Sequence, residues 1–328
     1  MTGTHLVTGV AGQDGTLLAR LLLARGQRVV GTVTSGSTSA GSPYLTGVEA
    51  VELDVRDTDG FAALVADTAP VAVHNLAALS SVGRSWEDPE TVEAVNHTAV
   101  VGMLAVLAGS DIRFVHASSS EIFGPVEAGV ADEQTPLNPT SPYAEAKARA
   151  HRAVATSRQA GLAATNLVLF GHTSALHTAT FVLPSITRQA AAAGLGQGTR
   201  VELRDPTVTR DWGAAVDHVR AFPAAADGPA GDYVIATGQL HQLADVARWA
   251  LAAAGLPAEA GDTGVTASGE PARRNDYGGV RGLTDHAGRE LGWHPTVTLR
   301  ATIEHMVTID ITRLRTGTED SVDYLPTV

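Results

Sequence analysis

The sequence predicts an α/β fold in which a doubly wound parallel sheet carries a smaller C-terminal lobe. Two observations lead to this prediction. Short apolar runs alternate with helical stretches through the first half of the chain, a pattern typical of parallel strands joined by right-handed crossovers. A glycine-rich turn, residues 9–15, joins the first apolar run to the first helical stretch. Together these features indicate a Rossmann-type sheet, which binds ligands at the carboxyl ends of its strands.

The predicted elements follow one another in regular order. Strands are expected at residues 5–8, 28–33, 48–55, 71–76, 112–117 and 163–170, and helices at 13–25, 61–67, 89–108 and 142–160. Further along, a strand is expected at 233–236 and a helix at 243–254. We expect residues 1–171 to form a dinucleotide-binding domain, with 208–255 returning to it. Residues 172–207 and 256–328 are expected to form a substrate-binding lobe.

The composition excludes several classes of protein. Hydrophobic residues make up 44% of the chain, which suits a large core, and a formal net charge of −12 argues against nucleic-acid binding. The chain has no cysteine, which excludes disulfides and thiolate catalysis, and its 12 histidines show no metal-ligand spacing. No apolar run reaches the about 18 residues of a membrane span. No metal and no membrane partner are expected, and the cytoplasm is the expected compartment.

The glycine-rich turn has the spacing of a dinucleotide-binding loop. Gly9 permits the tight turn, Gly12 lets the backbone approach a pyrophosphate, and Gly15 lets the helix pack against the strand. The amino end of the helix at Gln13 then faces the anion. An ordinary strand-to-helix turn is the alternative, and the position of the turn at the start of a βαβ series favours the dinucleotide.

Two later strand ends point to the same site. Asp54 closes the third strand and can accept a hydrogen bond from an adenine amino group, with a solvated turn as the alternative. Residues 75–78 close the fourth strand, and their small side chains either leave room for a cofactor or allow close packing.

A serine run followed by a tyrosine and a lysine is the strongest indication of chemistry. Serines 118–120 follow the fifth strand, and Tyr143 and Lys147 lie four residues apart on a helix that Ser141 can cap, so they share one face. A nearby ammonium lowers the pKa of a tyrosine, and a serine hydroxyl can hold the substrate oxygen. This group suits oxidation of a sugar alcohol by hydride transfer. An amphipathic helix is the alternative for the tyrosine and lysine alone.

Charged residues elsewhere fit the same chemistry. Glu121 can remove a proton beside a newly formed ketone, with a surface loop position as the alternative. Arg210 and Arg273 suit a diphosphate, and Asp276 suits ribose hydroxyls. A solvated charge cluster is the alternative for these three.

With these residues, the chain resembles the extended short-chain dehydrogenase/reductase family, and within it the GDP-mannose 4,6-dehydratases. The similar stretches extend over nearly the whole chain. They are TGVAGQDGTLLA from Thr8, NLAALSSV from Asn75, SWEDPETVEAVN from Ser85, ASSSEIFG from Ala117, SPYAEAKA from Ser141, TRDWGAAVDHV from Thr209, VIATG from Val234 and ELGWHPTVTLR from Glu290.

The resemblance implies three groups of site residues. The expected catalytic residues are Ser119, in place of the family's threonine, Glu121, Tyr143 and Lys147. The expected cofactor site comprises Gly9, Gly12, Gln13, Asp14, Gly15, Asp54, Val55, Ala77, Tyr143, Lys147 and His172. The expected substrate site comprises Ser80, Ser120, Asn166, Arg210, Arg273 and Asp276.

The implied reaction converts a nucleotide-bound hexose to its 4-keto-6-deoxy form through transient hydride transfer. A 4-keto-sugar reductase or 4-epimerase of the same family is the alternative enzyme, and a non-catalytic nucleotide-binding protein is the alternative of another class. The family's asparagine after the sixth strand is replaced by Gly171 here, and its following basic loop is replaced by Ala175, Leu176 and His177. The substrate is therefore a nucleotide sugar that need not be GDP-mannose.

The expected cofactor is NADP, with NAD as the alternative. The family has a basic pair after the second strand, whereas this chain has neither an arginine nor an acidic residue there. Without a carboxylate to repel it, a 2′-phosphate can accept hydrogen bonds from Thr34, Ser35 and Ser37. Such neutral bonds are about half as strong as charge-assisted ones.

The expected assembly is a homodimer. In the family, the basic pair after the second strand also helps to build a tetramer, and this chain lacks that pair. Two long helices would pair with their copies through apolar stripes. The stripe residues are Val92, Val95, Ala99 and Met103 on the first helix and Ala146, Ala150 and Val154 on the second. The alternative is that both stripes face the chain's own sheet.

Overall fold

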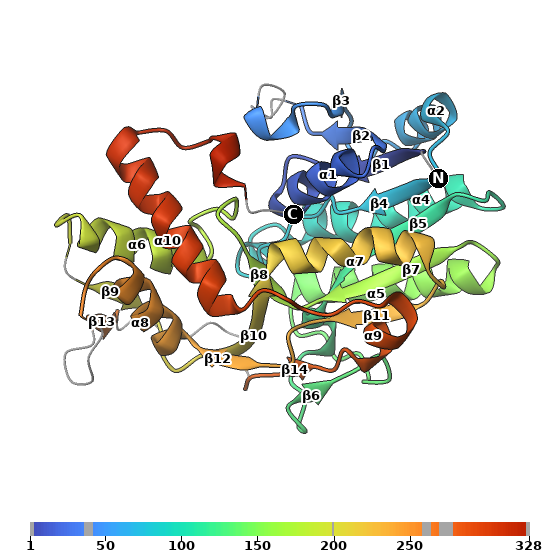
Figure 1. Ribbon diagram of the computed structural model, residues 1–328. Helices are drawn as coiled ribbons and strands as arrows, with labels where there is room; N and C mark the ends of the chain where they lie inside the picture. The colour runs from blue at the N-terminus through green and yellow to red at the C-terminus, as the bar shows by residue number, and fades with distance from the viewer. Residues whose placement is uncertain (1–2, 36–41, 199, 258–263, 269–277, 326–328) are drawn as a thin grey trace.

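The computed structural model describes residues 3–35, 42–198, 200–257, 264–268 and 278–325. At its centre lies a sheet of seven parallel strands in the order β11-β7-β5-β4-β1-β2-β3 (Figure 1). The strands are β1 (Thr4–Thr8), β2 (Arg28–Val33), β3 (Glu49–Glu52), β4 (Ala72–Asn75), β5 (Arg113–Ser119), β7 (Ala164–Leu169) and β11 (Asp232–Ile235). The strand order reverses between β1 and β4, and such a reversal opens a crevice at the carboxyl ends of the strands.

Helices cover both faces of this sheet because its strands alternate apolar residues to either side. Val7 of β1 packs into the core beneath α1 and α7, whereas its neighbour Leu6 packs beneath α2, α4 and α5. The helices are α1 (Gln13–Ala24), α2 (Thr58–Thr68), α3 (Pro89–Glu93), α4 (Ala99–Leu107), α5 (Pro142–Gln159), α7 (Ala215–Asp227) and α9 (Asp285–Leu291). The predicted doubly wound α/β fold is confirmed.

Two elements differ from their predicted form. The third strand stops at Glu52, because β3 is an edge strand that pairs only with β2, up to the level of Val33. The helix expected at 89–108 is divided by a π-helical turn, Ala94–Thr98, between α3 and α4. Buried Asn96 lies in this turn, and its side chain bonds the backbone N–H and carbonyl of Leu79 at 2.9 and 3.0 Å. The extra residue of the π turn therefore coincides with an asparagine that holds a neighbouring loop.

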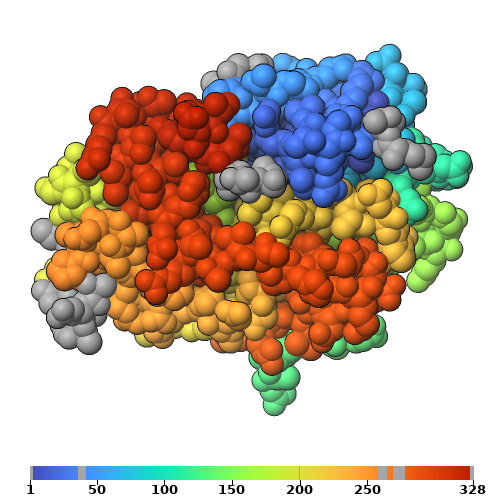
Figure 2. Space-filling model, in the orientation of Figure 1, coloured from blue at the N-terminus to red at the C-terminus, as the bar shows by residue number. Residues whose placement is uncertain are grey.

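A second hydrophobic core lies beside the sheet. It is formed by α6 (Val182–Gly194), α8 (Leu243–Ala253) and α10 (Leu299–Thr316), which pack through Ile186, Val246 and Ile303. Short strands complete this part of the chain: β8 (Gly171–Thr173), β10 (Thr209–Ala214) and β12 (Leu240–Gln242) pair together, as do β9 (Val201–Leu203) with β13 (Val265–Ala267) and β6 (Val130–Ala131) with β14 (Arg281–Gly282). In Figure 2, the orange-to-red residues from α9 to α10 run across the visible face and link the two cores.

The prediction that two apolar helix stripes are free to form a dimer interface is wrong. Val92, Ala99 and Met103 are buried within the chain, and so are Ala146 and Ala150. Small and branched side chains at this spacing let α4 and α5 pack closely on the sheet and on each other. The alternative holds: both stripes face the chain's own core. Among the described residues, none of the helices combines the length and the apolar character that crossing a membrane requires.

Candidate active site

A single large pocket of about 1800 Å³ follows the carboxyl ends of the parallel strands. Its walls come from the loops after β1, β2, β3, β4, β5 and β7, and from the second core on the far side. It includes all of the residues of the expected cofactor site and all of the expected catalytic residues. The crevice predicted by the strand order is therefore the site that the motifs share.

The glycine loop forms a cradle that only glycine fits. Gly9 has a φ of 68°, and a Cβ there would lie 2.9 Å from the Cα of Ala77. A Cβ on Gly15 would lie 2.3 Å from the carbonyl oxygen of Gly9. Gly12 caps α1 without a side-chain hydrogen bond, so the first amides of the helix are open to the pocket. These features fit the pyrophosphate of a dinucleotide.

An ion pair joins this loop to the strand β8 across the pocket. The Asp14 carboxylate lies 2.8 Å from Nε2 of His172, whose Nδ1 donates to the carbonyl of Phe170 at 2.7 Å. Burial opposes the charges, yet the His172 charge and hydrogen bond lower the pKa of Asp14 to about 2. Burial likewise opposes ionisation of His172, but the Asp14 carboxylate raises the pKa of the imidazole. His218 stacks on His172, and burial lowers its own pKa to about 3.

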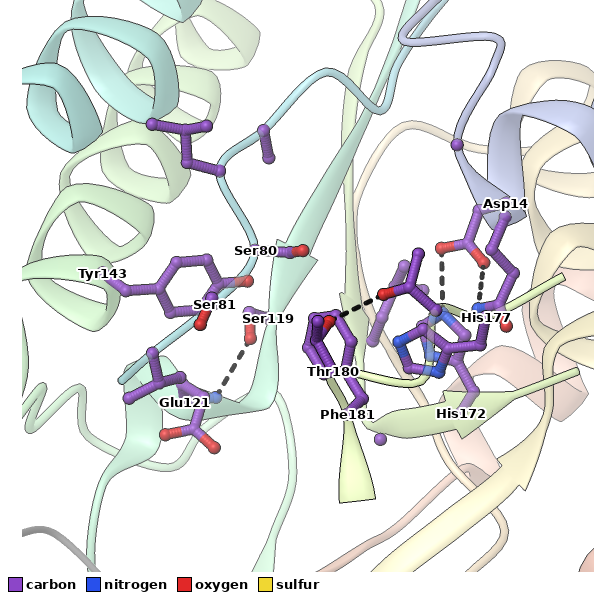
Figure 3. Close-up of a pocket in the computed structure, with 18 of the residues that line it drawn as sticks. Asp14, Ser80, Ser81, Ser119, Glu121, Tyr143, His172, His177, Thr180 and Phe181 are labelled. Carbon is purple, nitrogen blue, oxygen red and sulfur yellow. Dashed lines mark hydrogen bonds and ion pairs between the residues drawn. The ribbon is translucent and has the colours of Figure 1, made fainter. Parts of the chain in front are cut away.

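Ser119 and Tyr143 lie on the opposite side of the pocket from Asp14 (Figure 3), and Lys147 lines the same pocket. Ser141 caps α5 by accepting from the amide of Ala144 at 3.2 Å, and this start places Tyr143 and Lys147 one turn apart on the buried face. The Lys147 ammonium donates to the carbonyl of Ala117 at 2.8 Å.

The pKa values of Tyr143 and Lys147 are governed by burial. Burial lowers the pKa of Lys147 to about 8. The expectation that Lys147 lowers the pKa of Tyr143 is not met here, because burial raises that pKa to about 12 and outweighs the Ser119 hydrogen bond. The carboxylates of Glu121 and Asp14 add to this rise. The neutral phenol and the charged ammonium are therefore the forms at neutral pH.

Glu121 lies beside the serine and the tyrosine. It belongs to a 3-10 turn, Ser120–Phe123, that follows β5, and its amide donates to the Ser119 hydroxyl at 3.3 Å. In the view of Figure 3, Ser119, Glu121 and Tyr143 lie on one side of the pocket, with Ser80 above them. The arrangement places two hydroxyls and a carboxylate around one part of the pocket. Such a group can remove a proton from a substrate hydroxyl and another from the neighbouring carbon.

The loop after β3 contains a positively charged side chain, that of Arg56, which the sequence did not single out. Arg56 lines the pocket together with Thr34, Asp54 and Val55. Its guanidinium binds both oxygens of Asp54, with Nε at 3.0 Å and Nη2 at 2.5 Å, and this hydrogen bonding lowers the pKa of that carboxyl. The signal was available, because Arg56 follows the third strand by only a few residues.

The predicted substrate residues do not all reach the pocket. Ser80, Ser120 and Arg210 line it. The assignment of Asn166 to the substrate is wrong, because this residue lies in the middle of β7 and its side chain is buried beneath α5, where it bonds the carbonyl of His151 at 3.1 Å. Arg273 and Asp276 lie outside the described residues, as does Ser37.

Several lining residues had no recognisable signal in the sequence. Thr180 and Phe181 lie between the catalytic side and the Asp14 side in Figure 3. Arg204 and Trp212 line the part formed by the second core. These residues belong to segments whose packing depends on distant helices, so no local pattern predicts them. Among the described residues, no group of three histidines or carboxylates is arranged to hold a metal ion.

The family is decided by a match over nearly the whole chain. The sequence profile of GDP-mannose 4,6 dehydratases matches residues 6–306. The chain belongs to the GDP-mannose 4,6-dehydratase family. The family member from Sinorhizobium fredii is 32% identical over 342 residues, which cover 94% of this chain and 97% of that protein. The member named sdnI from Sordaria araneosa is 31% identical over 95% of this chain but only 61% of its own length, so the chain spans about three fifths of that protein.

A solved structure of a nucleotide-sugar epimerase shares the fold of this chain. The UDP-glucose 4-epimerase of Thermus thermophilus, in complex with NAD, superimposes with a TM-score of 0.80 at 26% identity. The match covers 94% of this chain and 99% of the epimerase. The family match and the relatives confirm the dehydratase family assignment and the expectation of an enzyme, and the similar solved structure confirms the Rossmann-type sheet.

Proposed function

We propose that this chain is a nucleotide-sugar 4,6-dehydratase that uses a nicotinamide cofactor. The observation that carries the proposal is that Ser119, Glu121, Tyr143 and Lys147 line one pocket together with the glycine cradle. The pocket is large enough for both a dinucleotide and a sugar nucleotide, because single ligand sites span about 300–1,000 Å³.

The chemistry follows from the positions of these side chains. The bound nicotinamide supplies a hydride acceptor that gives the hydride back within the same turnover. Tyr143 takes the proton of the sugar O4, and the Ser119 hydroxyl holds that oxygen. Burial keeps the Tyr143 phenol neutral before the reaction, and the Lys147 ammonium one turn away is the positive charge that would stabilise the phenolate as this step proceeds. Glu121 then takes the proton at C5, which the C4 ketone acidifies, and hydroxide departs from C6, with Ser120 as the lining hydroxyl on that side. With the cofactor bound, the hydride would return to C6 while Glu121 gives its proton back to C5. The departing hydroxide and the O4 proton then account for the net loss of one water.

The proposed cofactor form is NADP. Arg56 supports it, because a guanidinium at the ends of β2 and β3 can pair with a 2′-phosphate beside Thr34. NAD, the cofactor in the Thermus thermophilus epimerase structure, is the alternative. Calorimetric titration with each form distinguishes them, and tighter binding of NAD would overturn this choice.

The proposed organisation has two lobes and two copies. The strands and helices around the seven-stranded sheet form the cofactor lobe, and α6, α8 and α10 form the substrate lobe. This division corrects the expected boundaries, which gave α8 to the cofactor domain and α9 to the substrate lobe, because α8 packs into the second core and Ala287 of α9 packs into the first. We propose a homodimer through the outer faces of α4 and α5, where Val101 is 43% exposed. Light scattering tests the dimer, and a mass of one or four chains would contradict it. The cytoplasm remains the expected compartment and is tested by cell fractionation.

The activity is tested by incubating the protein with a panel of GDP-, UDP- and dTDP-hexoses and a trace of cofactor. A product lighter by one water, formed without net cofactor consumption, supports the dehydratase. Consumption of one reduced cofactor per product would instead identify a reductase.

A further inference from the structure

A row of polar side chains crosses the parallel sheet beneath the pocket. Thr8 pairs in register with Asn75, Asn75 with His116, His116 with Asn166, and Asn166 with Asp232. In-register residues of neighbouring parallel strands point to the same face. The five side chains therefore form one line from β1 to β11, and all except Asp232 are at most 1% exposed.

The hydrogen bonds on the β1 side have one direction. The Thr8 hydroxyl oxygen accepts from the amides of Leu76 and Ala77 at 3.2 and 3.1 Å, and its proton goes to Oδ1 of Asn75 at 2.7 Å. Nδ2 of Asn75 then donates to Nδ1 of His116 at 3.0 Å. Burial, and then the Lys147 charge, hold the pKa of His116 well below its usual range, so the ring is neutral. A neutral ring that accepts at Nδ1 carries its proton on Nε2.

The bonds on the β11 side have the matching direction. Nδ2 of Asn166 donates to the Asp232 carboxylate at 2.9 Å and to the carbonyl of His151 at 3.1 Å. Oδ1 of Asn166 is therefore an acceptor that points away from both. Arg158 binds the same carboxylate oxygen at 2.9 Å and fixes the end of the row.

Between the two halves, a donor and an acceptor are both unpaired. Nε2 of His116 and Oδ1 of Asn166 are buried and have no hydrogen-bond partner, although their residues are direct neighbours on β5 and β7. Buried polar groups are rarely left without a hydrogen-bond partner, and a buried water commonly connects such groups. We propose that one internal water accepts from His116 and donates to Asn166, completing a continuous chain from Thr8 to Asp232.

The row of hydrogen bonds from Asp232 to Thr8 ends on the loop that forms a wall of the catalytic pocket. The amides that Thr8 holds belong to Leu76 and Ala77, which line the pocket together with Ser80 and Ser81 further along the loop. His116 is thereby a positioning residue: it acts through Asn75 and Thr8 on the loop that the cofactor contacts. This role rests on the proposed function, whereas the water and the His116 tautomer do not.

The water is tested by a high-resolution crystal structure and by nitrogen NMR of His116. The expected result is one ordered water within hydrogen-bond distance of both atoms, with the ring protonated on Nε2. A direct bond between the two side chains, a dry gap or protonation on Nδ1 would each overturn the proposed chain, whatever the enzyme's activity.

The positioning role is tested with three variants. His116→Leu interrupts the row of hydrogen bonds, and His116→Gln restores a donor and an acceptor at this position. His74→Leu is the matched control, because His74 is equally buried and half-bonded but faces the opposite side, where it contacts His5 and Phe222.

The expected result is a loss of cofactor affinity of roughly tenfold in His116→Leu, equivalent to about 1.4 kcal/mol. His116→Gln should recover most of it, and His74→Leu should match the stability loss without the affinity loss. Equal affinity losses in the two leucine variants would reduce His116 to a structural role. If none of the proteins, including the unmodified one, turned over nucleotide sugars but the affinity pattern held, the proposed function alone would fail.

Discussion

Burial of the Lys147 ammonium has a cost in folding free energy that its hydrogen bond nearly offsets. Its ammonium is buried and donates to the carbonyl of Ala117. Burial lowers the pKa of the ammonium from 10.5 to about 8, which corresponds to about 3 kcal/mol of unfavourable free energy when the group is charged. A charged hydrogen bond contributes about 1.5–3 kcal/mol in the opposite direction. The two effects nearly cancel, so Lys147→Met should keep its free energy of unfolding within about 2 kcal/mol of the unmodified protein at neutral pH.

The pH dependence isolates this cost. The unfolded chain holds the lysine proton up to its ordinary pKa of 10.5, whereas the folded chain releases it from about pH 8. Since the unfolded state binds more protons in this window, the lysine makes stability rise with pH between these values. Lys147→Met should lack that rise, and the difference between the two proteins isolates it from the titration of other groups.

The assay is urea unfolding of both proteins at about pH 7 and about pH 9.5, with activity measured in parallel. Arg152→Met, an exposed position on the same helix, is the control and should change neither property. Activity of Lys147→Met should fall by about 10²–10⁴-fold, the usual size of an acid–base contribution. A stability difference that does not change between the two pH values would refute the reasoning about burial.

Three further predictions follow from the pocket. Glu121→Gln should stop water loss while still permitting partial reduction of added cofactor, measured by absorbance; full activity would remove Glu121 from the mechanism. Asp14→Asn should lower the melting temperature near pH 6, where His172 is charged, and the deficit should shrink as the pH rises above 6.5 through the raised pKa of the imidazole; a deficit independent of pH would contradict the ion pair. Gly15→Ala should impair folding itself, since a Cβ there meets the loop backbone at 2.3 Å, whereas Gly12→Ala, whose Cβ meets only one atom at 3.4 Å, should fold and lose cofactor affinity in calorimetry.

The sequence predicted those features that depend on local pattern. The glycine spacing fixes where the chain turns from β1 into α1, and Ser141 with Pro142 fixes where α5 begins. These two starts place the cradle and the Tyr143–Lys147 face, so the core of the site was predictable from short motifs and the order of the strands.

Features that depend on packing between distant segments were not predictable. Asn166 has the polarity of a ligand-binding residue, but its place in the middle of β7 directs it under α5 and into a row that only the strand register reveals. The stripe with Val92 and Met103 has the periodicity of an interface, yet a helix that covers a sheet has the same periodicity. The pKa of Tyr143 depends on burial, on the Ser119 hydrogen bond and on the carboxylates of Glu121 and Asp14, all of which come from elements far along the chain.

The proposed reaction moves the hydride from C4 of the sugar to C6 of the same molecule. The most direct measurement uses a nucleotide hexose labelled with deuterium at C4, incubated with the protein and a trace of unlabelled cofactor, and locates the label in the product by NMR. The expected product is a 4-keto-6-deoxy sugar that has lost one water and carries deuterium at C6, with the cofactor unchanged in amount. Deuterium accumulating in the cofactor, or a product that retains its C6 hydroxyl, would contradict it.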